Sequence, residues 1–188
     1  MIPFLLLFQL WATGTRLPVF DDYPTKEIFK GNPARVDLRS ESNAPRFRTR
    51  LTQDTAKGPN FAGSFTVVMW HCGSNCQTVA IVNAKNGRVH FPLSFATSYG
   101  VCFRRNSNLL ITDPIDAELV KDSDGTVPEW LKTRFFTWNG AKMTEIGTTR
   151  EVMKQSCGPV DDTSNNRLEK DLRPRSQSSR TLASQPLH

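Results

Sequence analysis

The spacing of apolar residues changes along the chain, and this change separates one helix from a group of strands. Phe47 and Leu51 stand four residues apart, so that both lie on one face of a helix. Both ends of this helix carry boundary signals: a cap at Ser42 or Asn43, Pro45 in the first turn, and Gly58-Pro59 as the stop. The sequence therefore predicts a helix between residues 42 and 58.

After the helix the apolar period falls to two, which is the period of a strand. The alternating positions are Phe61, Phe65, Val67, Met69, Val79, Ile81, Val89 and Phe91. Asn86-Gly87 and Asn139-Gly140 supply positive-φ residues for two hairpin turns, and residues 103–112 form a further strand. Successive hairpins pair antiparallel. We therefore expect a mainly β or α+β domain, in which an antiparallel sheet is built from hairpins and one N-terminal helix packs against it.

The two ends of the chain differ from the segment between them. Residues 1–14 carry no charge and contain an apolar run that ends in Ala12 and Gly14, a pattern typical of a signal peptide. Residues 158–188 are rich in Ser, Asn, Asp and Pro and have too few large apolar side chains to offset the entropy of ordering. We expect a signal peptide at 1–14, a single β-rich domain at 15–157 and a disordered polar tail at 158–188.

Composition and charge narrow the classes of partner. The chain has 188 residues, of which 38% are hydrophobic, and no apolar run approaches the ~20 residues that a spanning helix needs, so we expect no membrane span. The net charge is +6, and residues 59–112 contain no Asp or Glu. Lys and Arg are nevertheless scattered, which argues against nucleic acid as a partner. An envelope or extracellular protein, or an acidic polymer, suits the basic excess better.

The densest group of chemically active side chains lies in one short segment between two predicted strands. It reads Trp70-His71-Cys72-Gly73-Ser74-Asn75-Cys76-Gln77. An even number of cysteines in an exported chain favours structural disulfides, and four cysteines allow three connectivities. We favour Cys72 with Cys76 as a local clip and Cys102 with Cys157 as a long-range staple, because each is geometrically simple.

Chemical roles for these residues are less well supported. Thiol–disulfide exchange by Cys72 and Cys76 is the main alternative, although redox pairs are usually Cys-x-x-Cys at a helix N-terminus. His71 and His90 together with the two cysteines match no standard zinc spacing, and no third group marks a hydrolytic site. We therefore expect no catalytic residue, no metal and no cofactor.

Two exposed-looking groups remain as candidates for contact with a partner. They are the segment residues His71, Ser74 and Asn75, and the basic residues Arg48, Arg50, Arg104 and Arg105. The first group lies on a predicted turn, and Arg48 and Arg50 project mostly away from the apolar face of the predicted helix.

The motif Gly58-Pro59-Asn60-Phe61-Ala62-Gly63, followed by the cysteine segment 70–77, resembles a family of uncharacterised exported bacterial proteins. The likeness covers roughly residues 45–147. His71 departs from it, since the family has Gly there, so the resemblance does not imply a shared role for this histidine. It implies export to the periplasm or the medium and a cysteine pair in the loop, and it carries no activity.

Together these features favour a small, disulfide-stabilised, exported protein that acts as a non-catalytic binding module of the inhibitor or immunity type. The alternative is a redox protein that uses the Cys72/Cys76 pair.

Overall fold

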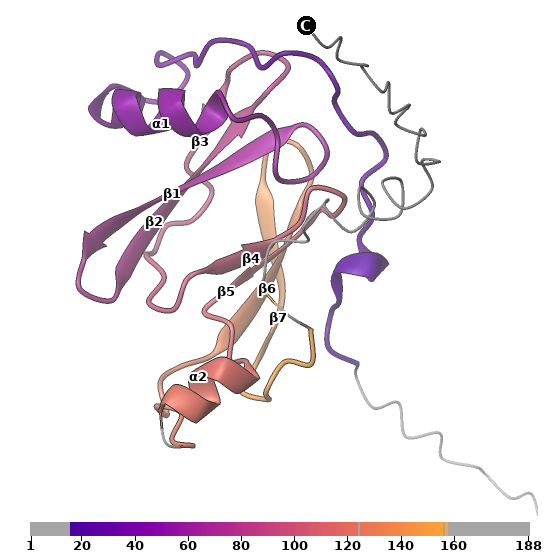
Figure 1. Cartoon of the computed structure of the whole chain (residues 1–188), viewed down its shortest axis with the longest axis vertical. Helices are drawn as coiled ribbons and strands as arrows, with labels where there is room; N and C mark the ends of the chain where they lie inside the picture. The colour runs from indigo at the N-terminus through magenta and orange to yellow at the C-terminus, as the bar shows by residue number, and fades with distance from the viewer. Residues whose placement is uncertain (1–15, 124, 156, 158–188) are drawn as a thin grey trace, which may run out of the picture. The chain divides into compact units, whose positions relative to one another are not determined.

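The computed structural model describes residues 16–123, 125–155 and 157 (Figure 1). Contacts divide the chain into two units, Met1–Gly158 and Pro159–His188, and the second lies outside the described residues. The expected signal peptide at 1–14 and the expected tail at 158–188 also lie outside them.

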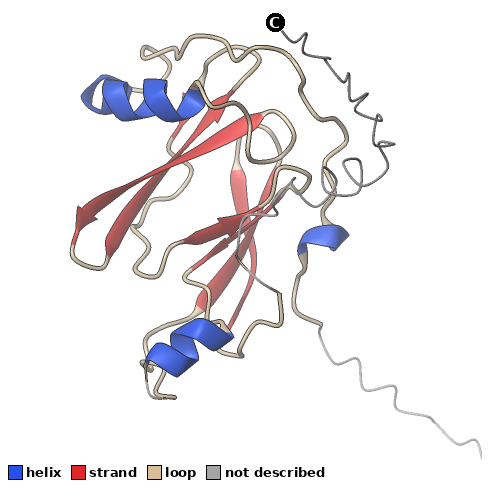
Figure 2. Cartoon of the chain, viewed as in Figure 1, coloured by secondary structure: helices blue, strands red, loops and turns tan. Residues whose placement is uncertain are grey.

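Within the described residues, seven strands form two antiparallel sheets, of order β1-β2-β3 and β4-β5-β6-β7 (Figure 2). The strands are β1 (Phe65–Gly73), β2 (Cys76–Asn83), β3 (Val89–His90), β4 (Val101–Phe103), β5 (Leu109–Thr112), β6 (Thr133–Trp138) and β7 (Met143–Thr149). The mainly β class and the antiparallel pairing are confirmed. The expected single sheet is in fact two.

The predicted helix is present, in two parts. A 3-10 turn, η2 (Ala44–Phe47), leads directly into α1 (Arg48–Thr55), and Leu51 is fully buried as its spacing predicts. The helix ends where the Gly58 N–H donates to the Thr55 carbonyl at 3.0 Å. It precedes every described strand but is not at the N-terminus of the chain, because residues 16–43 form an extended segment with one 3-10 turn, η1 (Phe20–Asp22).

Two features differ from the sequence prediction in the middle of the chain. The strand expected over 103–112 is divided into β4 and β5 by a turn around the buried Ser107, whose hydroxyl donates to the carbonyls of Phe20 and Tyr23. A second helix, α2 (Ala117–Asp122), was not predicted. Asp116 caps it by accepting a hydrogen bond from the Leu119 N–H at 2.9 Å.

Both predicted hairpin turns are confirmed, but only the glycine of each turn has the expected positive φ. Gly87 and Gly140 have φ of +76° and +99°, whereas Asn86 and Asn139 are not in the positive-φ region. The asparagines act through their side chains instead: the Oδ1 atoms accept hydrogen bonds from the N–H groups two residues on, at 3.0 Å in each turn.

The two sheets pack face to face over a central apolar cluster. It contains Phe65, Val67, Val79 and Ile81 from one sheet and Leu110, Phe136, Trp138 and Met143 from the other. Because side chains alternate along a strand, the neighbouring residues point to the outer faces. These outer faces are covered as well, so the domain has apolar contacts on both sides of each sheet.

The outer layers come from segments far apart in the sequence. Leu51 of α1 lies on the three-stranded sheet against Val68, Ala80, Val82 and Val89. Phe20 of η1 lies on the four-stranded sheet against Cys102, Leu109, Ile111, Phe135 and Met153. The N-terminal extended segment is therefore part of the core, although its sequence shows no strand or helix period.

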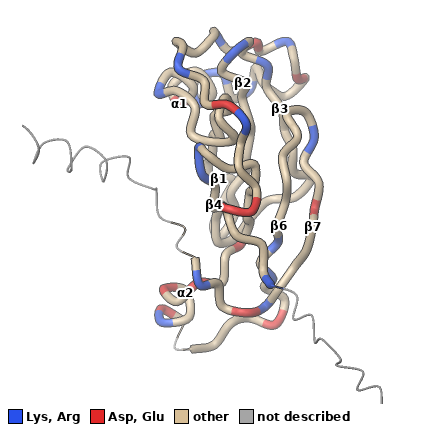
Figure 3. Tube along the Cα trace, turned by 90° about the vertical axis from the view of Figure 1, so that its right-hand side faces the viewer, with Lys and Arg blue, Asp and Glu red and all other residues tan. Residues whose placement is uncertain are grey.

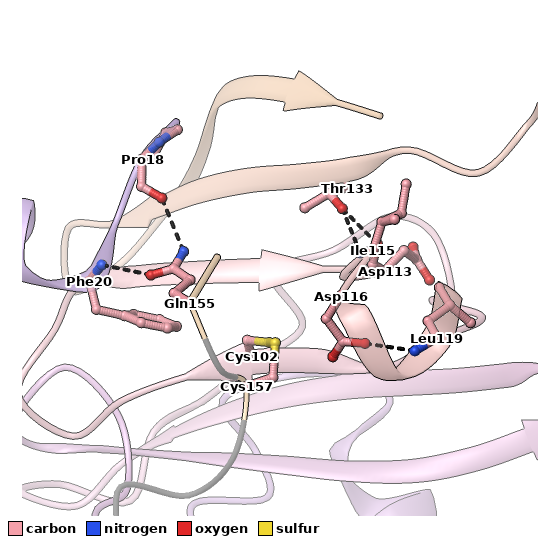
Figure 4. The surroundings of a disulfide bond; sticks show 10 residues. All are labelled: Pro18, Phe20, Cys102, Asp113, Ile115, Asp116, Leu119, Thr133, Gln155 and Cys157. Atoms are coloured by element: carbon pink, nitrogen blue, oxygen red, sulfur yellow. Dashed lines mark hydrogen bonds between the residues drawn. A yellow bond between two sulfur atoms is a disulfide. The ribbon is translucent and has the colours of Figure 1, made fainter. Parts of the chain in front are cut away.

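A disulfide fastens the C-terminal part of the described chain to β4 (Figure 4). The Cα atoms of Cys102 and Cys157 are 5.0 Å apart, and 55 positions separate the two residues in the sequence. Beside it, the Gln155 amide accepts from the Phe20 N–H at 3.3 Å and donates to the Pro18 carbonyl at 3.1 Å. The staple and this amide hold the two ends of the domain together.

Candidate functional site

The β1–β2 hairpin extends away from α1 and ends in the cysteine segment (Figure 1). Burial falls along it: Phe65 to Val68 are buried, whereas all residues from His71 to Asn75 are exposed. The sequence-predicted residues His71, Ser74 and Asn75 are thus brought together at one exposed tip, which we define as residues 71–77.

A disulfide closes the tip. The Cα atoms of Cys72 and Cys76 are 5.1 Å apart, and this pairing is the one favoured from the sequence. The turn needs unusual backbone, with φ of +149° at Gly73 and +50° at Asn75, which Gly and Asn tolerate better than other residues. The chain is therefore held in one local conformation just where it is most exposed.

The outer edge of β1 is covered near the core. Paired residues of an antiparallel ladder alternate, so that every second residue of β1 points its N–H and C=O away from β2. Phe65 is the first such residue, and its backbone exchanges hydrogen bonds with Phe61, both at 2.9 Å. Val67 is the next such residue, and the Asn60 side chain bonds to both of its backbone groups. The Asn60 Oδ1 accepts from the Val67 N–H at 2.7 Å, and Nδ2 donates to the Val67 carbonyl at 3.2 Å.

The same edge becomes free toward the tip. At Met69 only the carbonyl is covered, by two hydrogen bonds of 3.1 Å from the Arg50 guanidinium of α1. The next residue of β1 that points its N–H and C=O away from β2 is His71. Its partner on β2, Gln77, exchanges backbone hydrogen bonds with Thr97 and not with His71. Among the described residues, none bonds to the outward N–H of Met69 or to the outward N–H and C=O of His71.

A groove of about 540 Å³ runs beside this edge. Its walls are α1, the segment that follows α1, the outer part of β1, and Phe103 of β4. The lining residues are Arg50, Asp54, Lys57, Gly58, Pro59, Asn60, Val67, Met69, Trp70, His71, Gln77 and Phe103. The groove therefore combines free backbone groups, an apolar wall and charged side chains. We call it the edge groove.

The charges in the edge groove are partly compensated. Asp54 pairs with the guanidinium of Arg50 at 3.1 Å and with the Lys57 ammonium at 2.7 Å. One carboxylate thus faces two cations, which leaves a positive balance. Elsewhere Lys and Arg are spread over the molecule rather than gathered in a stripe (Figure 3), so the groove is distinguished by its shape and not by its charge alone.

The predicted basic residues have different surroundings. Arg48 is exposed on α1, and no described residue makes a hydrogen bond or ion pair with its side chain. Arg50 lines the edge groove. Arg104 lies 4.5 Å from the centre of the Phe20 ring, and the Arg105 Nη2 donates to the Phe29 carbonyl at 2.8 Å. Arg104 and Arg105 therefore hold the N-terminal segment in place, and neither lines the edge groove.

Of the two groups that shape the edge, sequence reasoning singled out Arg50 as a contact residue but not its bond to β1, and it did not single out Asn60. Asn60 lies in the motif 58–63, where its neighbours favour a turn. A turn residue whose side chain hydrogen-bonds to a strand seven positions later leaves no periodic signal in the sequence. The four-residue spacing of Arg50 and Asp54 on the helix was a usable signal for their ion pair. That Arg50 also reaches the Met69 carbonyl could be seen only with α1 placed on the sheet.

Comparisons with known proteins leave the family of this chain open. No protein-family model, no curated protein and no solved structure matches it.

Within the part of the chain that the structure describes, no helix has the length and apolar character needed to cross a membrane.

Proposed function

We propose that this protein is an exported, non-catalytic binding module that recognises a protein partner through the hairpin tip and the edge groove. The observation that carries the proposal is the free edge of β1 at Met69 and His71, beside a tip that a disulfide holds rigid. Rigid, exposed loops bind with a smaller loss of entropy than flexible ones. An inhibitor-like or immunity-type role would use both properties.

The free edge favours one mode of recognition. An extended peptide segment can add to β1 as a further strand, with main-chain hydrogen bonds at Met69 and His71. Asn60 and Arg50 limit the length of that strand, because Asn60 already occupies the edge at Val67 and Arg50 covers the Met69 carbonyl, which leaves the Met69 N–H and both backbone groups of His71. A short extended segment of the partner, not a whole sheet, therefore fits the edge groove.

Charge points to an acidic partner segment. The groove holds Arg50 and Lys57 against Asp54 alone, and residues 59–112, which include the whole hairpin, contain no carboxylate. A Glu or Asp of an added strand would find cations on the α1 side and no repelling acid on β1 or β2. An envelope or extracellular protein with such a segment is the proposed partner.

Export is the second part of the proposal. It rests on the apolar segment 1–14, on the resemblance of the motif 58–77 to an uncharacterised family of exported bacterial proteins, and on two disulfides. Disulfides persist in oxidising compartments, so the periplasm or the medium is the proposed location.

Site-specific photo-crosslinking tests the binding function. Ser74 and Ala141 are both exposed residues of hairpin turns, on the β1–β2 and β6–β7 hairpins respectively. Each is replaced by p-benzoylphenylalanine, and the full chain is expressed in the source cells and irradiated. We expect a discrete crosslinked protein from position 74 and none from position 141. The same products from both positions, or none from either, would contradict the proposal.

A crosslinked protein supports the proposal only if its affinity depends on the site. The purified partner is titrated with the wild type, with Lys57→Glu in the groove, and with Lys132→Glu, which makes the same change of charge at an exposed lysine directly before β6. Binding should weaken about tenfold or more with Lys57→Glu alone.

One observation favours thiol–disulfide exchange as a second candidate function. The Cys72–Cys76 disulfide is at the exposed tip, and the Thr78 hydroxyl donates to Cys72 Sγ at 3.3 Å, which would stabilise a thiolate after reduction. The reduction potential of this pair separates the candidates. A value well below about −300 mV would identify a structural clip and exclude the redox role.

A further inference from the structure

A second concavity, of about 410 Å³, lies on the four-stranded sheet and shares no lining residue with the edge groove. Three segments meet there: the connection from β3 to β4, the turn after β5, and the β6–β7 pair with the residues that precede it. The lining residues are Phe95, Ala96, Ser98, Asp113, Trp130, Leu131, Lys132, Arg134, Glu145 and Thr148.

Trp130 forms an exposed aromatic wall of this concavity. Its side chain is 65% exposed, more than any other large apolar residue in the described part of the chain. Its ring lies 6.2 Å from the Tyr99 ring at an interplanar angle of 31°, so one side is supported while much of the indole faces solvent. Exposure of so much apolar surface is unfavourable, and an exposed indole at the rim of a cavity is typical of a binding surface.

The floor of the concavity is polar and fixed. The Arg134 guanidinium lies 4.2 Å from the centre of the Phe95 ring, and its Nη2 donates to Glu145 Oε2 at 2.5 Å. The stacking and the ion pair together hold the plane of the guanidinium. Both side chains of the ion pair remain 35% exposed, so each still has hydrogen-bonding capacity toward a ligand.

Asp113 adds a carboxylate whose position is also fixed. Its Oδ1 accepts from the N–H groups of Ser98 and Tyr99, at 2.6 and 2.8 Å. These bonds tie the turn after β5 to the segment that carries Tyr99, and so to the support of the Trp130 wall. The Oδ2 atom has no hydrogen-bond partner among the described residues, which leaves an acceptor at the concavity.

The charges of the concavity cancel. Asp113 and Glu145 are opposed by Lys132 and Arg134, so the site has no net charge at neutral pH. A charged ligand would therefore gain little, whereas a neutral ligand with many hydroxyl groups would find both donors and acceptors. An aromatic wall beside planar polar groups is the arrangement that suits a sugar ring, whose C–H face stacks on an indole while its hydroxyls bond to guanidinium and carboxylate.

We propose that this concavity binds a neutral oligosaccharide, with one sugar ring stacked on Trp130 and its hydroxyls on Arg134, Glu145 and Asp113. The proposal does not depend on the protein-binding role of the hairpin tip, because the two sites share no lining residue. A module with both sites would bring a protein partner to a glycan surface.

Titration followed by NMR tests this proposal. The full chain, with its disulfides oxidised, is labelled with nitrogen-15, and the indole N–H signal of Trp130 is assigned by its loss in Trp130→Phe. The probes are hexasaccharides of glucose in two linkages, of mannose and of N-acetylglucosamine, added to about 10 mM so that millimolar dissociation constants are detected. We expect at least one of them to shift the Trp130 indole signal and the amides of the β6–β7 pair in a saturable manner.

Variants then separate the stacked site from weak surface binding. Trp130→Ala should weaken the binding of that hexasaccharide about tenfold or more, as is usual for the loss of a central aromatic contact. Val152→Ala is the matched control, because Val152 is 45% exposed and lines a different pocket. Glu145→Gln keeps the shape of the floor and should also weaken binding.

Three results would overturn the proposal. They are the absence of a shift with every neutral hexasaccharide, equal affinities of Trp130→Ala and Val152→Ala, and tighter binding of a hexagalacturonate than of any neutral probe. Circular dichroism of each variant establishes that a loss of binding is not a loss of fold.

Discussion

The side-chain amide of Asn60 makes with Val67 both of the hydrogen bonds that a neighbouring strand would make. The Oδ1 atom accepts from the Val67 N–H at 2.7 Å, and Nδ2 donates to the Val67 carbonyl at 3.2 Å. One residue thus ends the three-stranded sheet at the base of β1, and the edge beyond it is left for a partner. The proposed binding mode depends on this division of one edge into a closed base and a free tip.

We expect Asn60→Asp to destabilise the fold by about 1–2 kcal/mol, because the carboxylate has no donor for the Val67 carbonyl. Urea unfolding at neutral pH measures the change. Asn106→Asp is the control for charge, since Asn106 is exposed and its side chain makes no hydrogen bond with a described residue. Equal losses in the two variants would show that the Asn60 amide does not support the edge.

The glycines of the motif 58–63 should differ in their tolerance of a side chain. Gly58 and Gly63 both have positive φ, of +95° and +76°. A Cβ on Gly63 would lie 1.9 Å from the Glu27 carbonyl oxygen, whereas nothing lies within 4 Å of a Cβ on Gly58. Gly58→Ala should therefore cost only the backbone term of about 1 kcal/mol, and Gly63→Ala several times more. Thermal unfolding of the two variants would contradict this account if their midpoints were the same.

The two disulfides should contribute unequally to stability. In the chain-entropy model, the loss of Cys102–Cys157, which spans 55 positions, costs about 4 kcal/mol, and the loss of Cys72–Cys76, which spans 4, costs about 2 kcal/mol. The double variants Cys102→Ala/Cys157→Ala and Cys72→Ala/Cys76→Ala are compared by chemical unfolding. A larger loss in the tip variant would mean that the clip has a role in the core that the structure does not show.

Stability should depend on pH through His90. Its ring packs edge-on to Trp138, and burial, followed by the nearby Arg88 charge, holds the pKa of His90 below 6.5, while Glu41 acts in the opposite direction. The unfolded chain then binds a proton that the folded chain does not. The free energy of unfolding therefore falls as the pH drops below about 6.5 and levels off below the folded pKa.

Unfolding at about pH 7.5 and about pH 5 measures this difference. His90→Asn should reduce it, because the variant has no imidazole to titrate at this position. An unaltered difference in His90→Asn would assign the pH dependence to other groups.

Much of the fold could be predicted from local patterns. The positions of α1 and of the β2–β3 and β6–β7 hairpins followed from short-range signals, such as the four-residue spacing of Phe47 and Leu51 and the two Asn-Gly pairs. The division into two sheets could not. Val68 and Val82 alternate along their strands with residues of the central cluster, so they point to an outer face of the sheet. Because α1 covers that face, both faces of the sheet carry apolar residues, and the apolar period of the sequence does not show that a second sheet packs on one of them.

The candidate sites could be predicted only where the residues that form them are close together in the sequence. The tip was visible because Cys72 and Cys76 are four positions apart. The free edge beyond Asn60 and the exposed face of Trp130 were not visible, since exposure and hydrogen bonding depend on how distant segments pack. For the same reason Arg104 and Arg105 resembled surface recognition residues, although they contact the N-terminal segment.

Residue-specific amide exchange in the complex tests whether a segment of the partner adds to the free edge of β1. The labelled domain is saturated with the partner that crosslinks at Ser74, and the exchange rates of Met69, His71 and Val67 are compared with those of the free domain. Val67 is the internal reference, because its N–H is already bonded to Asn60. We expect amide exchange at Met69 and His71 to slow about tenfold or more, while exchange at Val67 changes little. Unchanged rates at Met69 and His71, with protection on another surface, would contradict this binding mode.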